Sequence, residues 1–257
     1  MFGWIASLIL VLIFSAGAGV PGTIDHALTN SLQQSVGPGA HATADVQGDP
    51  LLQLPFGVVP ELTASITGYT ANGMPIEAID LTVDDIHLDT GKLYGAHQAV
   101  LLKPAPTEAE VRLARPALQA QIDRLVTTGP LNHITTPLPF GGSANLRLAD
   151  VLLALAPGRV TLNGQAIMPN GYGVPFTLSV APVIVNSTQI AVSNPQLSLA
   201  GTALPPALLA PAIAQLNPLF DLRRLPMPPG DWHLTGFDLD ADGVTVTVSG
   251  DLTAIAH

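Results

Sequence analysis

The sequence has no cysteine, little charge and, in its first third, no basic residue. The absence of cysteine excludes a disulfide scaffold. Only 11% of the 257 residues are charged, against roughly 25% in an average soluble domain, and the net charge is −10. A chain with so few Lys and Arg residues is a poor partner for nucleic acid, because binding to phosphates depends on clustered positive charge. Since 47% of the residues are apolar, intrinsic disorder is excluded as well.

The negative charge is concentrated at the start of the chain. Residues 1–91 carry nine carboxylates, and Lys92 is the first basic residue. Residues 92–257 carry nine basic and ten acidic groups, so their charges nearly cancel. The acidic first third is typical of a solvated surface, and it would be repelled by anionic headgroups and other polyanions.

Catalytic motifs are also missing. The sequence contains no Gly-x-Ser-x-Gly elbow, cysteine nucleophile, phosphate-binding loop or His-Glu-x-x-His pair. The nearest approach to a metal site is Asp85, His87 and Asp89 at alternate positions of an expected strand, a pattern more typical of an exposed sheet edge. Asp238–Gly243 imitates the start of a calcium loop, but it lacks the final Glu and predicts a hairpin turn. We expect no enzyme and no cofactor.

The N-terminus predicts export. Residues 1–24 contain no charged side chain, Ile5–Phe14 is almost wholly apolar, and Ala16–Ala18 supplies a small-residue cleavage pattern. We therefore expect residues 1–18 to be a signal peptide that directs the protein to the periplasm or cell envelope. Because no Lys or Arg precedes the apolar core, an N-terminal anchor remains the alternative.

Residues 19–50 are expected to form a short helix and a linker. Ile24, Leu28, Leu32 and Val36 recur every four residues, which predicts a helix with a narrow apolar stripe. Residues 37–50 are rich in Gly, Ala and Pro and are interpreted as a linker.

Residues 51–257 are expected to form one α+β domain. Alternating apolar residues predict strands, most of them joined by Gly-containing turns; these strands cover residues 62–67, 76–83, 95–102, 159–166, 176–180, 190–199, 232–239 and 244–248. The tetrapeptide at Leu54–Gly57 recurs at Leu138–Gly141, and both halves contain a strand–turn–strand pattern. The domain is therefore predicted to consist of two similar halves.

Two helices are expected within this domain. Thr107 and Glu110 match a capping box, and the apolar spacing from Val111 to Leu125 predicts a helix with a kink or restart at Pro116. A second helix is expected around residues 209–216.

Several segments of the second half occur in an order known from one family. These are Gly158–Gly164, Leu197–Pro205, Leu222–Pro226 and the terminal hairpin from Trp232 to Val246. Together with Gly48–Phe56 they make residues 22–257 resemble the LmeA-like phospholipid-binding family of exported bacterial proteins. The resemblance implies non-catalytic binding of phospholipid at the bacterial membrane surface. It also implies a fold similar to tubular lipid-binding proteins, in which a long curved antiparallel sheet wraps one or two amphipathic helices.

Under this resemblance, an apolar slot for acyl chains is expected inside the sheet. Six aromatic side chains are candidates to line it, and we expect about two of them to touch lipid: Phe56, Phe140, Phe176, Phe220, Trp232 and Phe237. Arg223 and Arg224 form the only adjacent basic pair, and a guanidinium suits a lipid phosphate. The same pair equally suits the C-terminus of the preceding helix.

The rival hypothesis is a structural or adhesive envelope module with a packed core and a protein partner. It is motivated by Thr-rich strand faces such as Thr245 and Thr247. A third hypothesis is a hydrolase that uses the His87 region.

Overall fold

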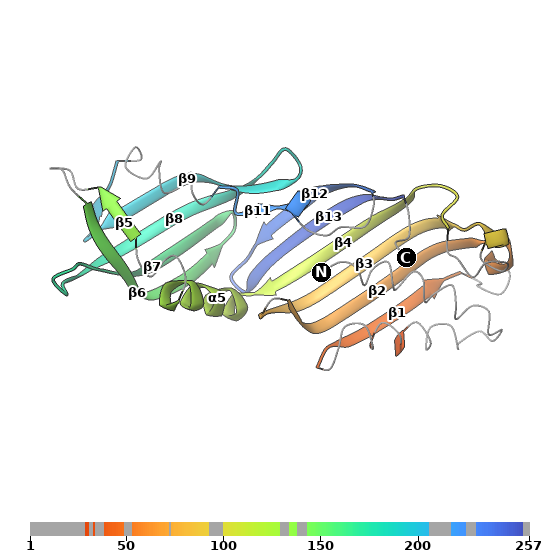
Figure 1. Ribbon diagram of the computed structural model, residues 1–257, viewed down its shortest axis with the longest axis horizontal. Coiled ribbons are helices and arrows are strands. Elements are labelled where there is room, and N and C mark those ends of the chain that lie inside the picture. The colour runs from red at the N-terminus through yellow and green to blue at the C-terminus, as the bar shows by residue number, and fades with distance from the viewer. Residues whose placement is uncertain are drawn as a thin grey trace. The chain divides into compact units, whose positions relative to one another are not determined.

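The computed structural model describes residues 29–30, 33, 39–48, 53–71, 73–92, 100–128, 134–137, 143–205, 217–224 and 230–253. The chain divides into two compact units, and each is described by itself. Unit 1 comprises residues 1–112, 221–236 and 245–257, and unit 2 comprises residues 113–220 and 237–244. Both are built mainly of antiparallel strands (Figure 1), so the expectation of a sheet-dominated fold is confirmed. The leader, residues 1–18, lies outside the described residues.

The first sheet has six strands in the order β1-β2-β3-β4-β13-β12. Their bounds are β1 His41–Gln47, β2 Val58–Ala71, β3 Met74–His87, β4 Ala105–Ala114, β12 Gly230–Leu239 and β13 Gly243–Leu252. A short 3-10 helix, η1 (Leu54–Phe56), precedes β2. The register pairs Leu62 with Val83 and Ile66 with Ile79, so one face is continuously apolar. Leu62 and Val83 are 0% exposed, which makes this face the core of unit 1.

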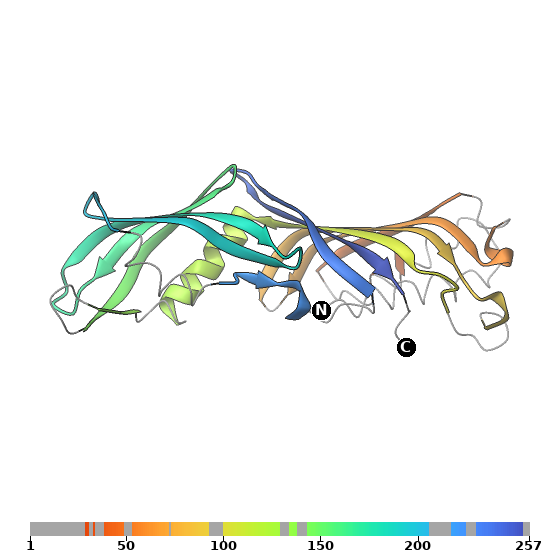
Figure 2. The same ribbon diagram turned by 90° about the horizontal axis from the view of Figure 1, so that it is seen from above.

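The second sheet has seven strands, in the order β10-β9-β8-β7-β6-β5 with β11 beside β9. Their bounds are β5 Ile134–Pro137, β6 Ser143–Ala156, β7 Arg159–Ile167, β8 Gly173–Val185, β9 Gln189–Leu199, β10 Thr202–Ala203 and β11 Phe220–Asp221. A short 3-10 helix, η4 (Leu222–Arg224), follows β11. Helix α5 (Arg115–Thr127) lies on one face of this sheet (Figure 2).

Most of the expected strands are present where the alternation predicted them. The terminal hairpin turns at residues 240–243, where Asp240 Oδ1 accepts the backbone N–H groups of Asp242 and Gly243, both at 2.8 Å. The calcium-like motif is therefore a turn, as expected. Of the strand expected at 95–102, residues 95–99 lie outside the described residues, and Leu101 forms a bridge with Leu88. The helix expected at 209–216 lies outside the described residues too.

The capping-box prediction was wrong. Thr107 belongs to β4, where it pairs with Val83, and its hydroxyl donates to Ala105 O. Helix α5 begins only at Arg115, and Pro116 stands in its first turn instead of kinking it. Proline favours that position because its ring fixes φ and its missing N–H has no partner there anyway.

The segment expected to be a linker contains strand β1. Ala42, Ala44 and Val46 are buried and alternate with exposed residues, but alanine is a weak strand former and hid the pattern. Thr29, Asn30 and Gln33 are helical, as predicted, whereas the apolar stripe of that helix lies outside the described residues. Among the helices that the structure describes, none has the length and apolar character needed to cross a membrane.

The free edge of β1 is covered by side chains of those helical residues. Gln33 donates from Nε2 to Ala40 O and accepts the N–H of Ala42 at 3.0 Å. Thr29 Oγ1 accepts the N–H of Ala44 at 3.1 Å. An exposed strand edge invites pairing with other chains, so these bonds protect it.

Candidate functional site

The apolar face of the second sheet is only partly covered. At its centre Val151, Ala166 and Phe176 are buried, but the apolar residues packed around them remain partly exposed: Ile122, Val126, Leu148, Leu162, Leu178, Leu197 and Leu199. In unit 1 the corresponding face is closed, with Leu62 and Leu81 almost inaccessible. Apolar side chains on the inner strands of a sheet are normally buried, so the partial exposure of these residues sets this face apart from the face of unit 1.

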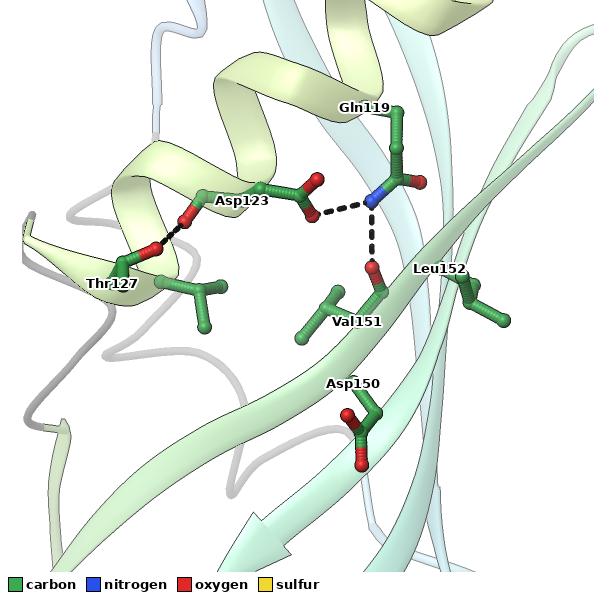
Figure 3. A pocket seen from close by; sticks show the side chains of 7 residues that line it. Gln119, Asp123, Thr127, Asp150, Val151 and Leu152 are labelled. Carbon is green, nitrogen blue, oxygen red and sulfur yellow. Dashed lines mark hydrogen bonds between the residues drawn. The ribbon is translucent and has the colours of Figure 1, made fainter.

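Helix α5 is fixed to the edge of this sheet by one glutamine. Gln119 donates from Nε2 to Val151 O at 2.7 Å (Figure 3). Its Oε1 accepts the N–H of Leu153, also at 2.7 Å. The same Nε2 also donates to Asp123 at 2.7 Å. Among the described residues, β5 pairs with β6 as far as Leu146, and beyond that point the side-chain amide of Gln119 forms the two bonds that a neighbouring strand would otherwise form.

A hollow of about 350 Å³ opens between α5 and β6. Val126, Val151 and Leu152 contribute its apolar lining. Asp123 and Asp150 contribute carboxylates (Figure 3). Asp150 sits where the register of β6 shifts, and its φ is +52°. The shift turns successive side chains of β6 away from strict alternation. Unit 2 therefore combines a partly open apolar face with a polar rim.

The predicted aromatic residues fall into different environments. Phe176 and Trp232 are buried, whereas Phe220 and Phe237 are half-buried. Phe56 is 79% exposed at the end of η1, and Phe140 lies outside the described residues. Because Phe176 and Phe220 belong to unit 2 and Phe56 and Trp232 to unit 1, the structure does not describe one common aromatic cluster.

The two buried aromatics each lie over a glycine of the neighbouring strand. A Cβ built at Gly164 would lie 2.9 Å from Cε1 of Phe176, and one at Gly250 would lie 2.8 Å from Cε3 of Trp232. Only a glycine leaves space for the ring in each case. These two rings therefore help to form the cores of their units.

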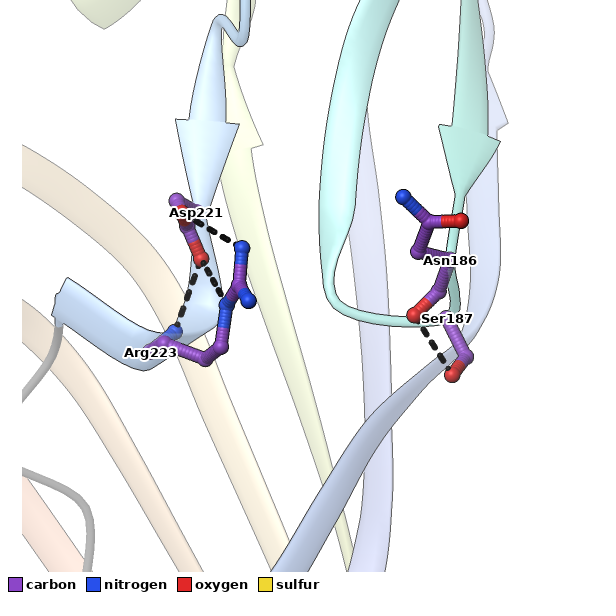
Figure 4. Close-up of polar contacts among 4 residues, drawn as sticks. All are labelled: Asn186, Ser187, Asp221 and Arg223. Carbon is purple, nitrogen blue, oxygen red and sulfur yellow. Dashed lines mark hydrogen bonds and ion pairs between the residues drawn. The ribbon is translucent and has the colours of Figure 1, made fainter.

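Arg223 is already engaged with a carboxylate. Its Nε and Nη2 donate to the two oxygens of Asp221 at 3.1 and 3.2 Å, and its backbone N–H donates to Asp221 Oδ1 (Figure 4). The hydrogen bonds and the negative charge of Asp221 raise the pKa of Arg223. The guanidinium itself is exposed. Arg224 follows in η4, and its side chain lies outside the described residues.

Two of the three residues in the metal-like pattern, Asp85 and His87, are bonded to each other, and Asp85 also forms an ion pair with Lys103. His87 Nε2 lies 2.8 Å from Asp85 Oδ1, and Lys103 donates to the other oxygen of that carboxylate. The hydrogen bonds from Lys103 and His87 lower the pKa of Asp85. Asp85 has a φ of +51°, so the strict alternation that was expected to align it with His87 and Asp89 is interrupted. Within the described ranges, no three His, Asp or Glu side chains are grouped to hold a metal.

Comparison with known proteins identifies the family. Residues 16–249 match the model of the family described as LmeA-like phospholipid-binding. The chain belongs to this LmeA-like family. No curated protein matches it. Among solved structures, the di-domain ARO/CYC StfQ from the steffimycin biosynthetic pathway gives 13% identity over 95% of this chain and 81% of that one. Its TM-score is 0.17, so this likeness carries no argument.

Sequence reasoning missed the features that shape the candidate site in this LmeA-like chain. The half-buried leucines of β7, β8 and β9 were visible as alternation, but alternation does not reveal how completely a face is covered. Gln119 carried no signal, because a glutamine on a helix is usually a solvated residue.

Proposed function

We propose that this protein binds phospholipid without catalysis, holding acyl chains against the partly covered apolar face of unit 2. The observation that carries this proposal is the incomplete burial of Leu162, Leu178, Leu197 and Leu199, on the same face as the buried Phe176. Membership of a phospholipid-binding family supports phospholipid as the ligand. The expected signal peptide supports a place of action in the periplasm or cell envelope.

The energetics of such a site are adequate. Each buried CH₂ contributes about 0.8 kcal/mol, so about ten of them supply about 8 kcal/mol. That gross value corresponds to a micromolar dissociation constant, from which the ordering of the lipid must still be subtracted. Two acyl chains of ordinary length contain more than enough methylene groups to cover this cost. Of the predicted aromatic residues that the structure describes, Phe176, Phe220 and Phe237 belong to unit 2, and Phe176 lies on this face.

Native mass spectrometry of the exported protein, purified without detergent, tests the proposal. We expect an adduct with the mass of a diacyl phospholipid. A bare chain that stays bare after incubation with liposomes would contradict lipid binding. If crosslinking in intact envelopes then captured a protein partner, the hypothesis of a packed structural module would replace the lipid-binding proposal.

A pair of variants on one strand localises the site. Leu178→Trp places a large ring on the partly open face and should displace lipid. Val183→Trp makes a similar change on the same strand at an already exposed position, and it should leave the adduct intact. Equal lipid content in both variants would place the acyl chains elsewhere.

A further inference from the structure

The end of unit 1 where β2 begins and β3 finishes carries two large exposed apolar side chains. Phe56 is 79% exposed and Leu102 is 65% exposed. Both lie just outside the strands of the sheet, Phe56 before β2 and Leu102 before β4. Burial does not account for either side chain, since each leaves most of its apolar surface in water.

Backbone hydrogen bonds bring these two residues to the same end. Leu88 N–H donates to Gly57 O at 2.7 Å, and Leu102 N–H donates to His87 O at 2.8 Å. The segment after β3 thus runs between them, and a spacing of two strands separates them by about 10 Å. Gly57 is required here: its φ is +73°, and an added Cβ would lie within 3 Å of Leu88 O. The apolar pair is therefore held in place by the fold.

Two lysines lie at this end of unit 1, and the sequence contains no other lysine. Lys92 and Lys103 both lie between β3 and β4, and both are exposed. Residues 84–104 contain these two lysines and three carboxylates, Asp84, Asp85 and Asp89, which gives a net charge of −1. Lys103 is paired with Asp85. We call Phe56, Lys92, Leu102 and Lys103 the end patch.

We propose that the end patch docks on the surface of a phospholipid bilayer. Phe56 and Leu102 enter the headgroup region, while Lys92 and Lys103 lie along the interface with their ammonium groups at lipid phosphates. Lysine suits this position because its apolar stem can be buried while its charge stays in water. The choice of a bilayer as the occupant rests on the proposed function, since a phospholipid carrier must reach a membrane to load its ligand.

Cosedimentation of the exported full chain with vesicles tests this docking surface. We expect Phe56→Ser and Leu102→Ser each to weaken partitioning about tenfold, the value for the loss of one large apolar side chain. The matched control is Tyr172→Ser, which removes an aromatic side chain of similar exposure, 69%, from unit 2. It should leave partitioning unchanged. An equal loss in all three variants would indicate nonspecific adsorption and would overturn the proposal, as would unchanged partitioning in the Phe56 and Leu102 double variant.

Charge changes test the role of the lysines. Asp85→Asn releases Lys103 from its partner, so it should strengthen binding to vesicles containing phosphatidylglycerol and have little effect on pure phosphatidylcholine. Lys92→Gln should act in the opposite direction on the anionic vesicles. An absence of any change on anionic vesicles in both variants would contradict the assignment of the lysines to phosphates.

A gain of signal provides an independent measurement. Phe56→Trp should show blue-shifted emission and quenching by brominated lipids on vesicle binding, whereas Tyr172→Trp should show neither beyond the background of the wild-type protein. The proposal would be overturned if tryptophan at position 56 stayed fully exposed to an aqueous quencher in the presence of vesicles. It would also be overturned if Phe56→Ser lost a crosslink to a protein partner in envelopes but kept its binding to vesicles.

The failure of docking and of lipid binding can be told apart. If the wild-type protein carries a phospholipid adduct and Phe56→Ser loses vesicle binding, both proposals stand. If no form carries lipid and vesicle binding still depends on Phe56, only the lipid-carrier proposal fails. If lipid is carried and vesicle binding ignores Phe56, only the docking proposal fails.

Discussion

The attachment of helix α5 to β6 through Gln119 leads to a quantitative prediction for Gln119→Ala. The substitution removes the acceptor of the Leu153 N–H and the donor to Val151 O, both in partly buried surroundings. One such hydrogen bond contributes about 1 kcal/mol net, and an unpaired buried group costs about 1–3 kcal/mol. Water can reach part of this site, so we expect a local cost of about 2 kcal/mol.

Hydrogen exchange at the Leu153 amide measures this cost directly. About 2 kcal/mol corresponds to exchange roughly 30-fold faster at this amide, because each 1.4 kcal/mol is a factor of ten. Gln121→Ala is the matched control, since it makes the same change on the same helix at a position that the structure does not bond to Val151 or Leu153. Equal exchange at Leu153 in the two variants would refute the reasoning, and so would acceleration spread evenly over unit 2.

The isosteric substitution Gln119→Glu adds a pH test. The introduced carboxylate would face Val151 O and Asp123, so its charged form is disfavoured and its pKa is raised in the folded state. A raised folded pKa gives stability that is present below the unfolded value and lost as the pH rises through the folded value. We therefore expect the variant to approach the wild-type stability in acid and to fall below it at neutral pH, as measured by urea unfolding.

Three further predictions concern other residues. Changing Arg223 and Arg224 together to Gln should weaken binding of anionic lipid more than that of neutral lipid, and equal losses would show that the pair serves the fold. Gly164→Ala should lower the free energy of unfolding by about 1–3 kcal/mol, because its Cβ would meet the ring of Phe176. Since the pKa of Asp85 is lowered, the small stability difference between wild type and Asp85→Asn should be present at neutral pH and disappear as the pH falls through that lowered pKa; acid titrations of both proteins check this.

The sequence predicted the strands well, because their signal is local. In β2 and β3 the alternation of Leu62, Ala64 and Ile66 and the turn before Met74 are sufficient to define a hairpin. The helix start failed because residues 105–110 satisfy two patterns. Thr107 and Glu110 match a cap, but Ala105, Thr107 and Ala109 also alternate, and pairing with β3 selects the strand. Such nonlocal pairing leaves no trace in a single window of sequence.

The site was harder to predict because it depends on what covers each face. Phe56 and Phe176 have the same side chain, and both were candidates for the slot. One is exposed on η1 and the other is buried opposite Gly164, since the strand neighbour decides whether a ring finds a place to pack. The family resemblance supplied the ligand class from short segments, whereas the partly open face became apparent only from the packing of α5 on the sheet.

The way in which α5 is attached explains how an open apolar face can coexist with a fixed helix. A helix held only by its apolar stripe has to cover the sheet in order to stay on it. Helix α5 packs Ile122 and Val126 on the sheet, and Gln119 also bonds to the edge of β6. Gln33 does the same on β1, and Asn217 on β9 through the N–H and carbonyl of Val192. These directional bonds fix the position of a segment at the sheet edge without requiring full apolar contact. Helix α5 can therefore form one wall of a lipid site while the leucines beside it remain available to an acyl chain.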